Sequence, residues 1–219
     1  MGLYLGLDTS NYTTSAALYD SGGDRVFSEK KPLPVKAGAL GLRQSDAVFH
    51  HTVQLPEVVE RLMAAAGISL NEVDAFAVDV GPGSFTGLRI GVCAVNALAF
   101  AANKPVIAVD ALRALAEPYW DGAEPILSLV DAGHAASYAA LYQTGRCVIP
   151  PCKRETEELL AAQTPETRVI SGVAPRAADV ALAAWRLRDT VCEAAAPLYI
   201  QPSQAERLYE ERMGGAAHG

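Results

Sequence analysis

Residues 81–116 read GPGSFTGLRIGVCAVNALAFAANKPVIAVDALRALA, and this stretch decides the fold class. It follows the apolar run Val73–Val80, whose length and composition are those of a buried strand. The glycines end that strand, and Leu88–Ala102 is long and apolar enough for a buried helix before Val106–Val109 returns as a strand. Strand, glycine loop, helix and strand in this order predict an α/β fold, with a further helix starting near Asp110.

The first 31 residues predict three antiparallel strands. Turn-forming residues at 8–11 and 20–24 separate three short runs of strand-forming residues. We therefore expect strands at Leu3–Leu7, Thr13–Tyr19 and Arg25–Lys31.

An amphipathic helix is expected after a glycine-containing loop at 34–44. Apolar residues recur at three and four residue steps from Asp46 to Met63, with Ser45 as N-cap and Gly67 as the stop. Pro56 lies inside this pattern, so it is expected to divide the helix or kink it.

The second half of the chain repeats the alternation of strands and helices less regularly. We expect strands at 125–131, 136–142 and 168–171, a helix near 156–162, and one more helix within 174–196. No long low-complexity linker separates the halves. The sequence therefore predicts two subdomains of the same kind, residues 1–108 and 109–219.

Composition excludes several function classes. The 18 basic and 25 acidic residues give a net charge of -7, so the average surface repels a phosphate backbone and any nucleic-acid contact is expected to be indirect. The four cysteines form no CxxC pair, which favours reduced thiols over a zinc site or a disulfide framework. No basic leader with an apolar core and no membrane span is evident, so we expect a cytoplasmic protein without membrane contact.

Two loops at strand ends are candidate phosphate cradles: Asp8-Thr9-Ser10 and Gly81–Gly87. Glycines let backbone N–H groups approach an anion closely, and a following helix N-terminus adds favourable partial charge. The same glycines can serve only to let two backbone segments pack closely. The second loop is neither a Walker A sequence nor a dinucleotide-binding fingerprint, so both interpretations stay open.

The polar residues considered one by one predict little chemistry. Asp8 can orient a magnesium-bound water or simply close a local turn through its side chain. His50 and His51 are adjacent, so on a helix they point about 100° apart and cannot form a metal-binding pair. Ser10 and Ser84 lack a nucleophile elbow and a His/Asp partner set, which argues against a serine hydrolase.

The helix expected at 88–102 has almost no polar face. Such a helix is either buried at the centre of its own domain or partly covered by another chain. The sequence leaves both interpretations open.

The stretch 81–116, the opening LGLDTSNYTTSAALYD at 5–20 and the ending PLYIQPSQAERLYEERM at 197–213 together resemble the bacterial TsaB family, also called YeaZ. That family belongs with the TsaD proteins to one superfamily, whose members have also carried a glycoprotease label. The resemblance covers most of the first 116 residues and the tail, and 119–196 only in outline.

The resemblance implies two subdomains of the actin-like ATPase fold, which is related to ribonuclease H, each a mixed sheet flanked by helices. It implies a non-catalytic accessory subunit in tRNA threonylcarbamoyladenosine biosynthesis that scaffolds a TsaD-type threonylcarbamoyltransferase. It also implies a homodimer when the chain is alone, a TsaE-type ATPase as a further partner, and ATP or ADP with magnesium at a partner interface. The alternative is a small ATP-binding transferase or kinase of the same fold.

The chain departs from both relatives at identifiable positions. TsaD proteins carry a metal-binding HxxxH pair just after the strand that here is Val106–Val109, whereas this chain has DALRA at 110–114. The segment KAGALGLRQSDAVFHH at 36–51 is longer than the usual TsaB stretch and closer to a TsaD-like paralogue. Asp131-Ala132-Gly133 stands where TsaB proteins often have Asp-Ala-Arg.

The two loops and the family resemblance together give two sets of candidate site residues. A vestigial nucleotide-binding set comprises Asp8, Thr9, Ser10, Gly81 and Gly83. An interface set comprises Phe85, Thr86, Gly87, Leu88, Arg89 and Val92. No catalytic residue and no metal ligand is assigned.

Overall fold

The computed structural model describes residues 1–32 and 44–201, and the side chains of the latter segment from residue 50 onward. The expected loop at 34–43 and the tail from 202 lie outside these residues.

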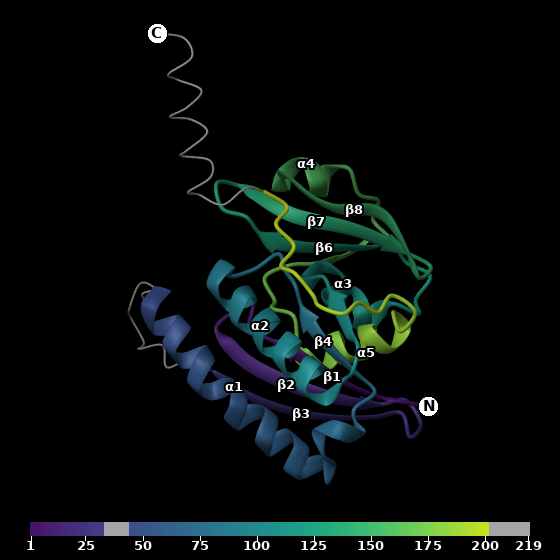
Figure 1. Cartoon of the computed structure of the whole chain (residues 1–219). Helices are drawn as coiled ribbons and strands as arrows, with labels where there is room; N and C mark the ends of the chain where they lie inside the picture. Colours follow the sequence, from purple (N-terminus) through teal and green to yellow (C-terminus); the bar gives the residue numbers. More distant parts are fainter. Residues whose placement is uncertain (33–43, 202–219) are drawn as a thin grey trace.

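The first sheet has the strand order β3-β2-β1-β4-β5 (Figure 1). β1 (Leu3–Asp8), β2 (Thr13–Asp20) and β3 (Arg25–Pro32) pair antiparallel, as the turn residues predict. β4 (Ala75–Asp79) and β5 (Val106–Val109) join β1 in parallel. The carboxyl ends of β1, β4 and β5 therefore meet at one edge, where the two candidate loops begin.

Helices cover both faces of the first sheet. α1 (Gln44–Ala66) and α2 (Phe85–Ala102) pack on one face, over the core that contains Leu5, Leu7 and Leu18. α5 (Ala177–Arg186) packs on the other face, against Tyr4, Ala17 and Tyr19, because successive residues of a strand point to opposite faces. A Cβ on Gly6 would lie 2.7 Å from the Ala181 nitrogen, so only glycine lets α5 approach β1 this closely.

Pro56 does not divide the first long helix, because α1 continues through it as one element. α2 begins at Phe85, earlier than the sequence predicts, because Ser84 caps it and its hydroxyl accepts a hydrogen bond of 3.3 Å from the Gly87 nitrogen. The other expected strands and helices of this half are confirmed within a few residues.

The second sheet has the order β8-β7-β6-β9. β6 (Ile126–Asp131), β7 (Ala136–Gln143), β9 (Arg168–Ile170) and α4 (Thr156–Ala161) occur where the sequence predicts them. β8 (Arg146–Glu155) is not predicted, because Pro150 and Pro151 argue against a strand. It lies at the sheet edge and pairs with β7 through register shifts, and both features make its prolines tolerable.

The two sheets are joined through α3 (Ala111–Ala116), which lies against β6 and β7, and through α5. Short 3-10 turns, η1 (Leu70–Glu72) and η2 (Glu117–Tyr119), complete the described elements. Two mixed sheets flanked by helices confirm the expected actin-like α/β fold. The division of the chain at residues 108 and 109 stays a prediction. α5 follows the second sheet in sequence yet packs on the first.

Candidate functional site

The two loops predicted as phosphate cradles contact each other directly. The Ser84 nitrogen donates a hydrogen bond of 2.8 Å to the Ser10 carbonyl oxygen. The Thr9 hydroxyl donates one of 2.7 Å to the Gly87 carbonyl oxygen. The Ser84 N–H group and the Thr9 hydroxyl, which could otherwise donate to an anion, are thus hydrogen-bonded within the protein.

The glycines of the second loop make this close contact possible. A Cβ on Gly87 would lie 2.0 Å from the Thr9 carbonyl oxygen, and one on Gly83 would lie 2.8 Å from the Ser10 Cβ. Gly81 has a φ of 105°, a backbone conformation that favours glycine. Close packing of backbone therefore accounts for the glycine pattern by itself.

Asp8 closes a turn of its own chain. Its Oδ1 accepts a hydrogen bond of 2.8 Å from the Ser10 nitrogen, and its Oδ2 accepts one of 2.7 Å from the Asn11 amide. Asp79, at the end of β4, does the same through its Oδ1, which accepts a hydrogen bond of 2.7 Å from the Gly81 nitrogen. Both carboxyl groups are buried.

Burial controls the protonation of these two carboxyl groups. It raises the pKa of Asp8 to about 6, against hydrogen bonds from Ser10 and Asn11 that lower it. Burial, and then the charge of Asp8, raise the pKa of Asp79 well above its ordinary value. Within residues 1–32 and 44–201, no group of three or more metal-ligating side chains could hold a metal ion.

A cleft of about 510 Å³ lies between the loops and the second sheet. One wall comes from Asn11, Tyr12 and Ser84, and the other from Asp131 and the segment 172–175. Asp131 uses its Oδ1 to accept a hydrogen bond of 2.8 Å from the Gly133 nitrogen. Among the described residues that line this cleft there is no lysine or arginine to neutralise a triphosphate.

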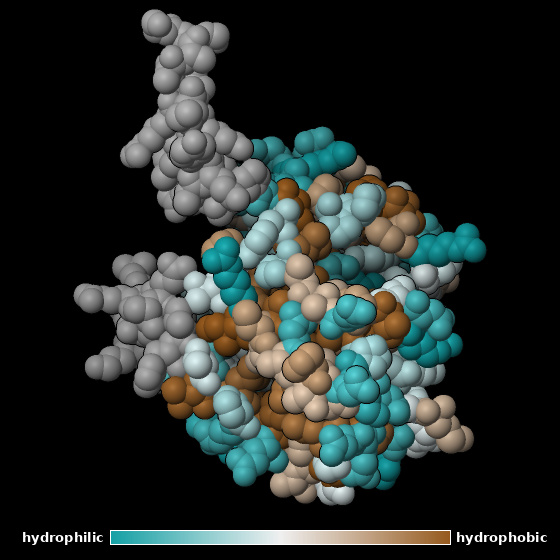
Figure 2. Space-filling view, viewed as in Figure 1, coloured by the Kyte–Doolittle hydropathy of each residue, from teal (hydrophilic) through white to brown (hydrophobic). Residues whose placement is uncertain are grey.

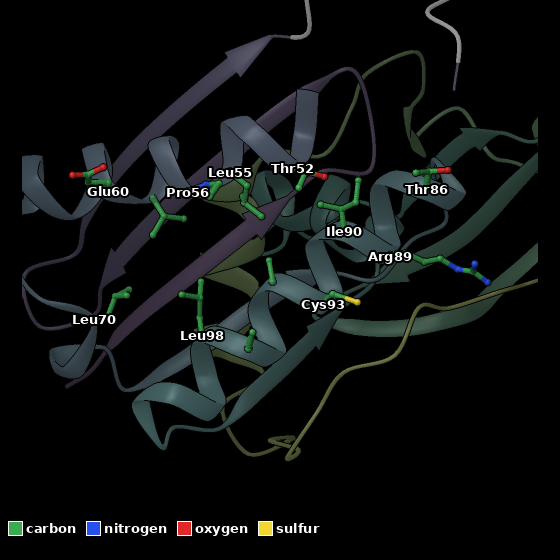
Figure 3. A pocket seen from close by; sticks show the side chains of 13 residues that line it. Thr52, Leu55, Pro56, Glu60, Leu70, Thr86, Arg89, Ile90, Cys93 and Leu98 are labelled. Atoms are coloured by element: carbon green, nitrogen blue, oxygen red, sulfur yellow. The ribbon is translucent and has the colours of Figure 1, made fainter. Parts of the chain in front are cut away.

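A second hollow, the α1/α2 groove, lies on the outer face of the first sheet (Figure 3). It has a volume of about 710 Å³, and its walls are mostly aliphatic side chains of the two helices. The area between α1 and α2 is largely brown, that is hydrophobic, in Figure 2. The charged lining residues are Glu60 on α1 and Arg89 on α2. The lining residues are Thr52, Leu55, Pro56, Val59, Glu60, Leu70, Thr86, Arg89, Ile90, Cys93, Ala94, Ala97 and Leu98.

The predicted interface residues divide into two groups. Thr86 and Arg89 line the groove. Leu88 and Val92 are only 2% and 4% exposed and lie in the core, so they support the surface from below instead of forming contacts on it. Gly87 is likewise buried against Thr9. The sequence does not reveal which side of an apolar helix the sheet covers, so the burial of Leu88 and Val92 is visible only in the structure.

α2 is long and apolar enough, by length and composition alone, to cross a membrane, with 33% of its residues buried. Part of the remaining apolar surface of α2 borders the α1/α2 groove. Phe100, near the helix end, is 89% exposed. α2 therefore contributes one side to the core and leaves part of its apolar surface exposed.

Sequence reasoning missed the clamp that fixes Arg89. Its guanidinium lies 4.0 Å from the Phe85 ring centre, and its Nε donates a hydrogen bond of 3.0 Å to the Tyr199 hydroxyl. Phe85 and Tyr199 stack with ring centres 5.1 Å apart. The segment carrying Tyr199 is held to α2 by Asn96, whose amide bonds both the nitrogen and the oxygen of Ala195.

The groove-lining residues Ile90, Cys93, Ala94, Ala97 and Leu98 were also missed as candidates. Their three and four residue spacing on α2, facing a matching stripe on α1, is the signal that points to them.

The fold, the mutually closed loops and the exposed helix pair define a small actin-like α/β protein with an apolar surface groove. The family model TsaD: tRNA N6-adenosine threonylcarbamoyltransferase matches residues 35–191, and the chain belongs to this family. Within it the chain is TsaB/YeaZ-like.

Two curated relatives are TsaB proteins, described as tRNA threonylcarbamoyladenosine biosynthesis proteins. The chain is 32% identical over 141 residues to that of Escherichia coli K12, covering 64% of this chain and 54% of the relative. It is 39% identical over 130 residues to that of Haemophilus influenzae, covering 58% and 48%. It is also 39% identical over 140 residues to the tRNA N6-adenosine threonylcarbamoyltransferase of a Jannaschia species, covering 59% and 38%. The chain therefore spans about half or less of these relatives.

A solved structure, YeaZ from Pseudomonas aeruginosa, matches with a TM-score of 0.71 and 29% identity, covering 91% of this chain and 100% of that one. A second structure from that organism, described as similar to peptidase YeaZ, has a TM-score of 0.72 at 29% identity and covers 92% and 100%.

Proposed function

We propose that this chain acts in tRNA threonylcarbamoyladenosine biosynthesis as a non-catalytic accessory subunit. Its α1/α2 groove docks a TsaD-type threonylcarbamoyltransferase. The groove is the observation that carries the proposal, and the TsaB relatives name the pathway.

The groove has the features of a protein interface. Its lining is aliphatic over both helices, with Arg89 and Glu60 as charged residues. Exposed apolar surface of this extent costs solubility unless another chain covers it. The fitting occupant is a partner helix face with an apolar centre and opposite charges where Arg89 and Glu60 lie.

The other end of the sheet supports a binding role over a catalytic one. The two loops that would grip phosphates are bonded to each other through Ser10, Ser84, Thr9 and Gly87. The segment 110–114 lacks the HxxxH pair that the resemblance to TsaD proteins leads one to expect. These observations disfavour the alternative of a small ATP-binding transferase or kinase.

Calorimetric titration tests the proposal directly. The purified chain is titrated with a TsaD-type partner from the same organism, and separately with ATP and magnesium. We expect binding of the partner and no heat from nucleotide alone. Tight nucleotide binding with hydrolysis, both abolished by Asp8→Ala, would establish the transferase or kinase alternative instead.

A matched pair of variants locates the interface. Ala97→Glu places a charge inside the groove, and Ala161→Glu places the same charge on an exposed turn of α4. Ala97→Glu should weaken partner binding at least tenfold, because a buried unpaired carboxylate at an interface is costly. Equal affinity of the two variants for the partner would show that the groove is not part of the interface.

The proposal has further parts that follow from the resemblance. The same face pairs two copies of the chain when the partner is absent, a TsaE-type ATPase joins the complex, and ATP or ADP with magnesium binds only at the partner interface. The protein works in the cytoplasm, and its tRNA contact is indirect. Analytical ultracentrifugation of the chain alone and with each partner tests the assembly states.

A further inference from the structure

Asp8 and Asp79 form a buried pair of acids at the ends of adjacent parallel strands. Both residues are only 1% exposed. Three of their four carboxyl oxygens accept hydrogen bonds, from the nitrogens of Ser10, Asn11 and Gly81. The fourth, Asp79 Oδ2, is buried and receives none from the described residues.

This pair has no direct cationic partner among the described residues. None of the lysine or arginine side chains there donates a hydrogen bond or forms an ion pair to either carboxyl group. Asp110, at the end of β5, adds a third acid, but its Oδ1 already accepts hydrogen bonds from the Arg113 nitrogen and the Tyr142 hydroxyl. From the other elements, Glu29, Lys30 and Arg176 line the cavity beside Asp8.

One bound proton would remove both the unsatisfied oxygen and the repulsion between the two acids. As a carboxylate, Asp79 Oδ2 would be a buried, unsatisfied anion next to a second anion. As a carboxylic acid it becomes a donor, and Asp8 is the neighbouring acceptor, because Leu7 pairs with Val78 and the two acids follow them at the ends of adjacent parallel strands.

We infer that Asp8 and Asp79 share one proton in the folded protein, and that this proton fastens the ends of β1 and β4 in the arrangement that closes the two loops. Loss of the proton places two anions side by side, and their repulsion loosens the contacts of Ser10 and Gly81. The closed state of the loops thus depends on pH. The inference stands on this pair alone and is independent of the α1/α2 groove.

Infrared spectroscopy detects the shared proton in the unmodified protein. A carbonyl stretching band of a protonated carboxylic acid is expected at pH 7. It should be absent from Asp79→Asn and retained in Asp131→Asn, the same substitution at an exposed turn. Absence of the band from the wild-type protein at pH 7 would overturn the inference without any variant having to fold.

Unfolding measurements separate a proton from a metal ion. The wild-type unfolding equilibrium constant should rise by up to about tenfold per pH unit as pH rises from about 4 through the folded-state pKa values. Asp79→Asn should flatten this rise and be at least as stable at pH 8, because its amide donates to Asp8 without a titratable proton. A stabilisation of the wild type by magnesium that Asp79→Asn abolishes would instead show that the pair binds a cation.

Discussion

The Thr9 hydroxyl and the Gly87 carbonyl oxygen, 78 residues apart in sequence, are joined by a hydrogen bond of 2.7 Å. This contact fastens the end of β1 to the first turn of α2. It brings together the two loops that the sequence marks as candidate phosphate cradles, so that they hydrogen bond to each other.

Gly87→Ala should destabilise the protein by at least ~2 kcal/mol, because a core cannot absorb an added methyl group without strain. The new Cβ would lie 2.0 Å from the Thr9 carbonyl oxygen, which is backbone and cannot move aside freely. Gly22→Ala is the control, since its nearest neighbour is a side-chain oxygen at 3.3 Å. Urea unfolding of both variants measures the difference, and a wild-type midpoint for Gly87→Ala would refute the close packing.

Arg89→Glu should weaken binding of a TsaD-type partner about tenfold or more, because it reverses the charge at the groove and breaks the clamp with Tyr199. Arg146→Glu makes the same charge reversal on the exposed strand β8 and should bind normally. Titration calorimetry compares the two. If Arg89→Glu binds the TsaD-type partner with unchanged affinity, Arg89 does not belong to the interface.

Glu117→Ala should cost ~3–5 kcal/mol of stability, because it leaves the buried Arg113 without its ion-pair partner. Glu117 also accepts a hydrogen bond of 2.6 Å from Arg186, which ties α5 to the start of the second sheet. Glu57→Ala breaks an exposed pair with Lys31 that solvent screens, and it should leave the stability almost unchanged. Similar losses in the two variants would contradict the structural role of Glu117.

His51 should make the protein less stable as pH falls. It is 2% exposed, its Nδ1 lies 2.8 Å from the Thr14 hydroxyl, and burial lowers its pKa. The unfolded chain therefore takes up a proton first, and stability is lost from about pH 6.5 downward through the folded-state pKa.

Because Asp8 and Asp79 act in the opposite direction over part of this range, the test of His51 is a difference between proteins. His51→Gln should remove the acid-side loss and leave the rest of the stability profile unchanged. Identical profiles for His51→Gln and wild type below pH 6.5 would show that His51 does not titrate on unfolding.

Most elements of the fold follow from local patterns. The turn residues at 8–11 and 20–24, the periodic apolar residues of α1 and the run 81–116 each predict their structure from neighbours in sequence. β8 could not be predicted in this way. A strand tolerates Pro150 and Pro151 only at the edge of a sheet, and which strand lies at the edge is decided when the sheet assembles.

The site follows from sequence only in outline. Thr86 and Arg89 were found because they belong to a recognisable stretch, and both line the groove. Leu88 and Val92 belong to the same stretch but face the core. Residues on α1, such as Leu55 and Val59, could be assigned only after the two helices were placed side by side.

By itself the sequence determined the α/β class, the order of the strands and helices other than β8, and the resemblance to the TsaB family, because periodicity, turn chemistry and motif spacing are local properties of the chain. Tertiary structure alone decided that the glycine loop is closed by Thr9 and Ser10, that Arg89 is held by Tyr199, and that Asp8 and Asp79 end adjacent strands. Each of these contacts joins residues far apart in sequence. Their distance and burial, which set the energy of a hydrogen bond or a charge, exist only once the sheets and helices have packed.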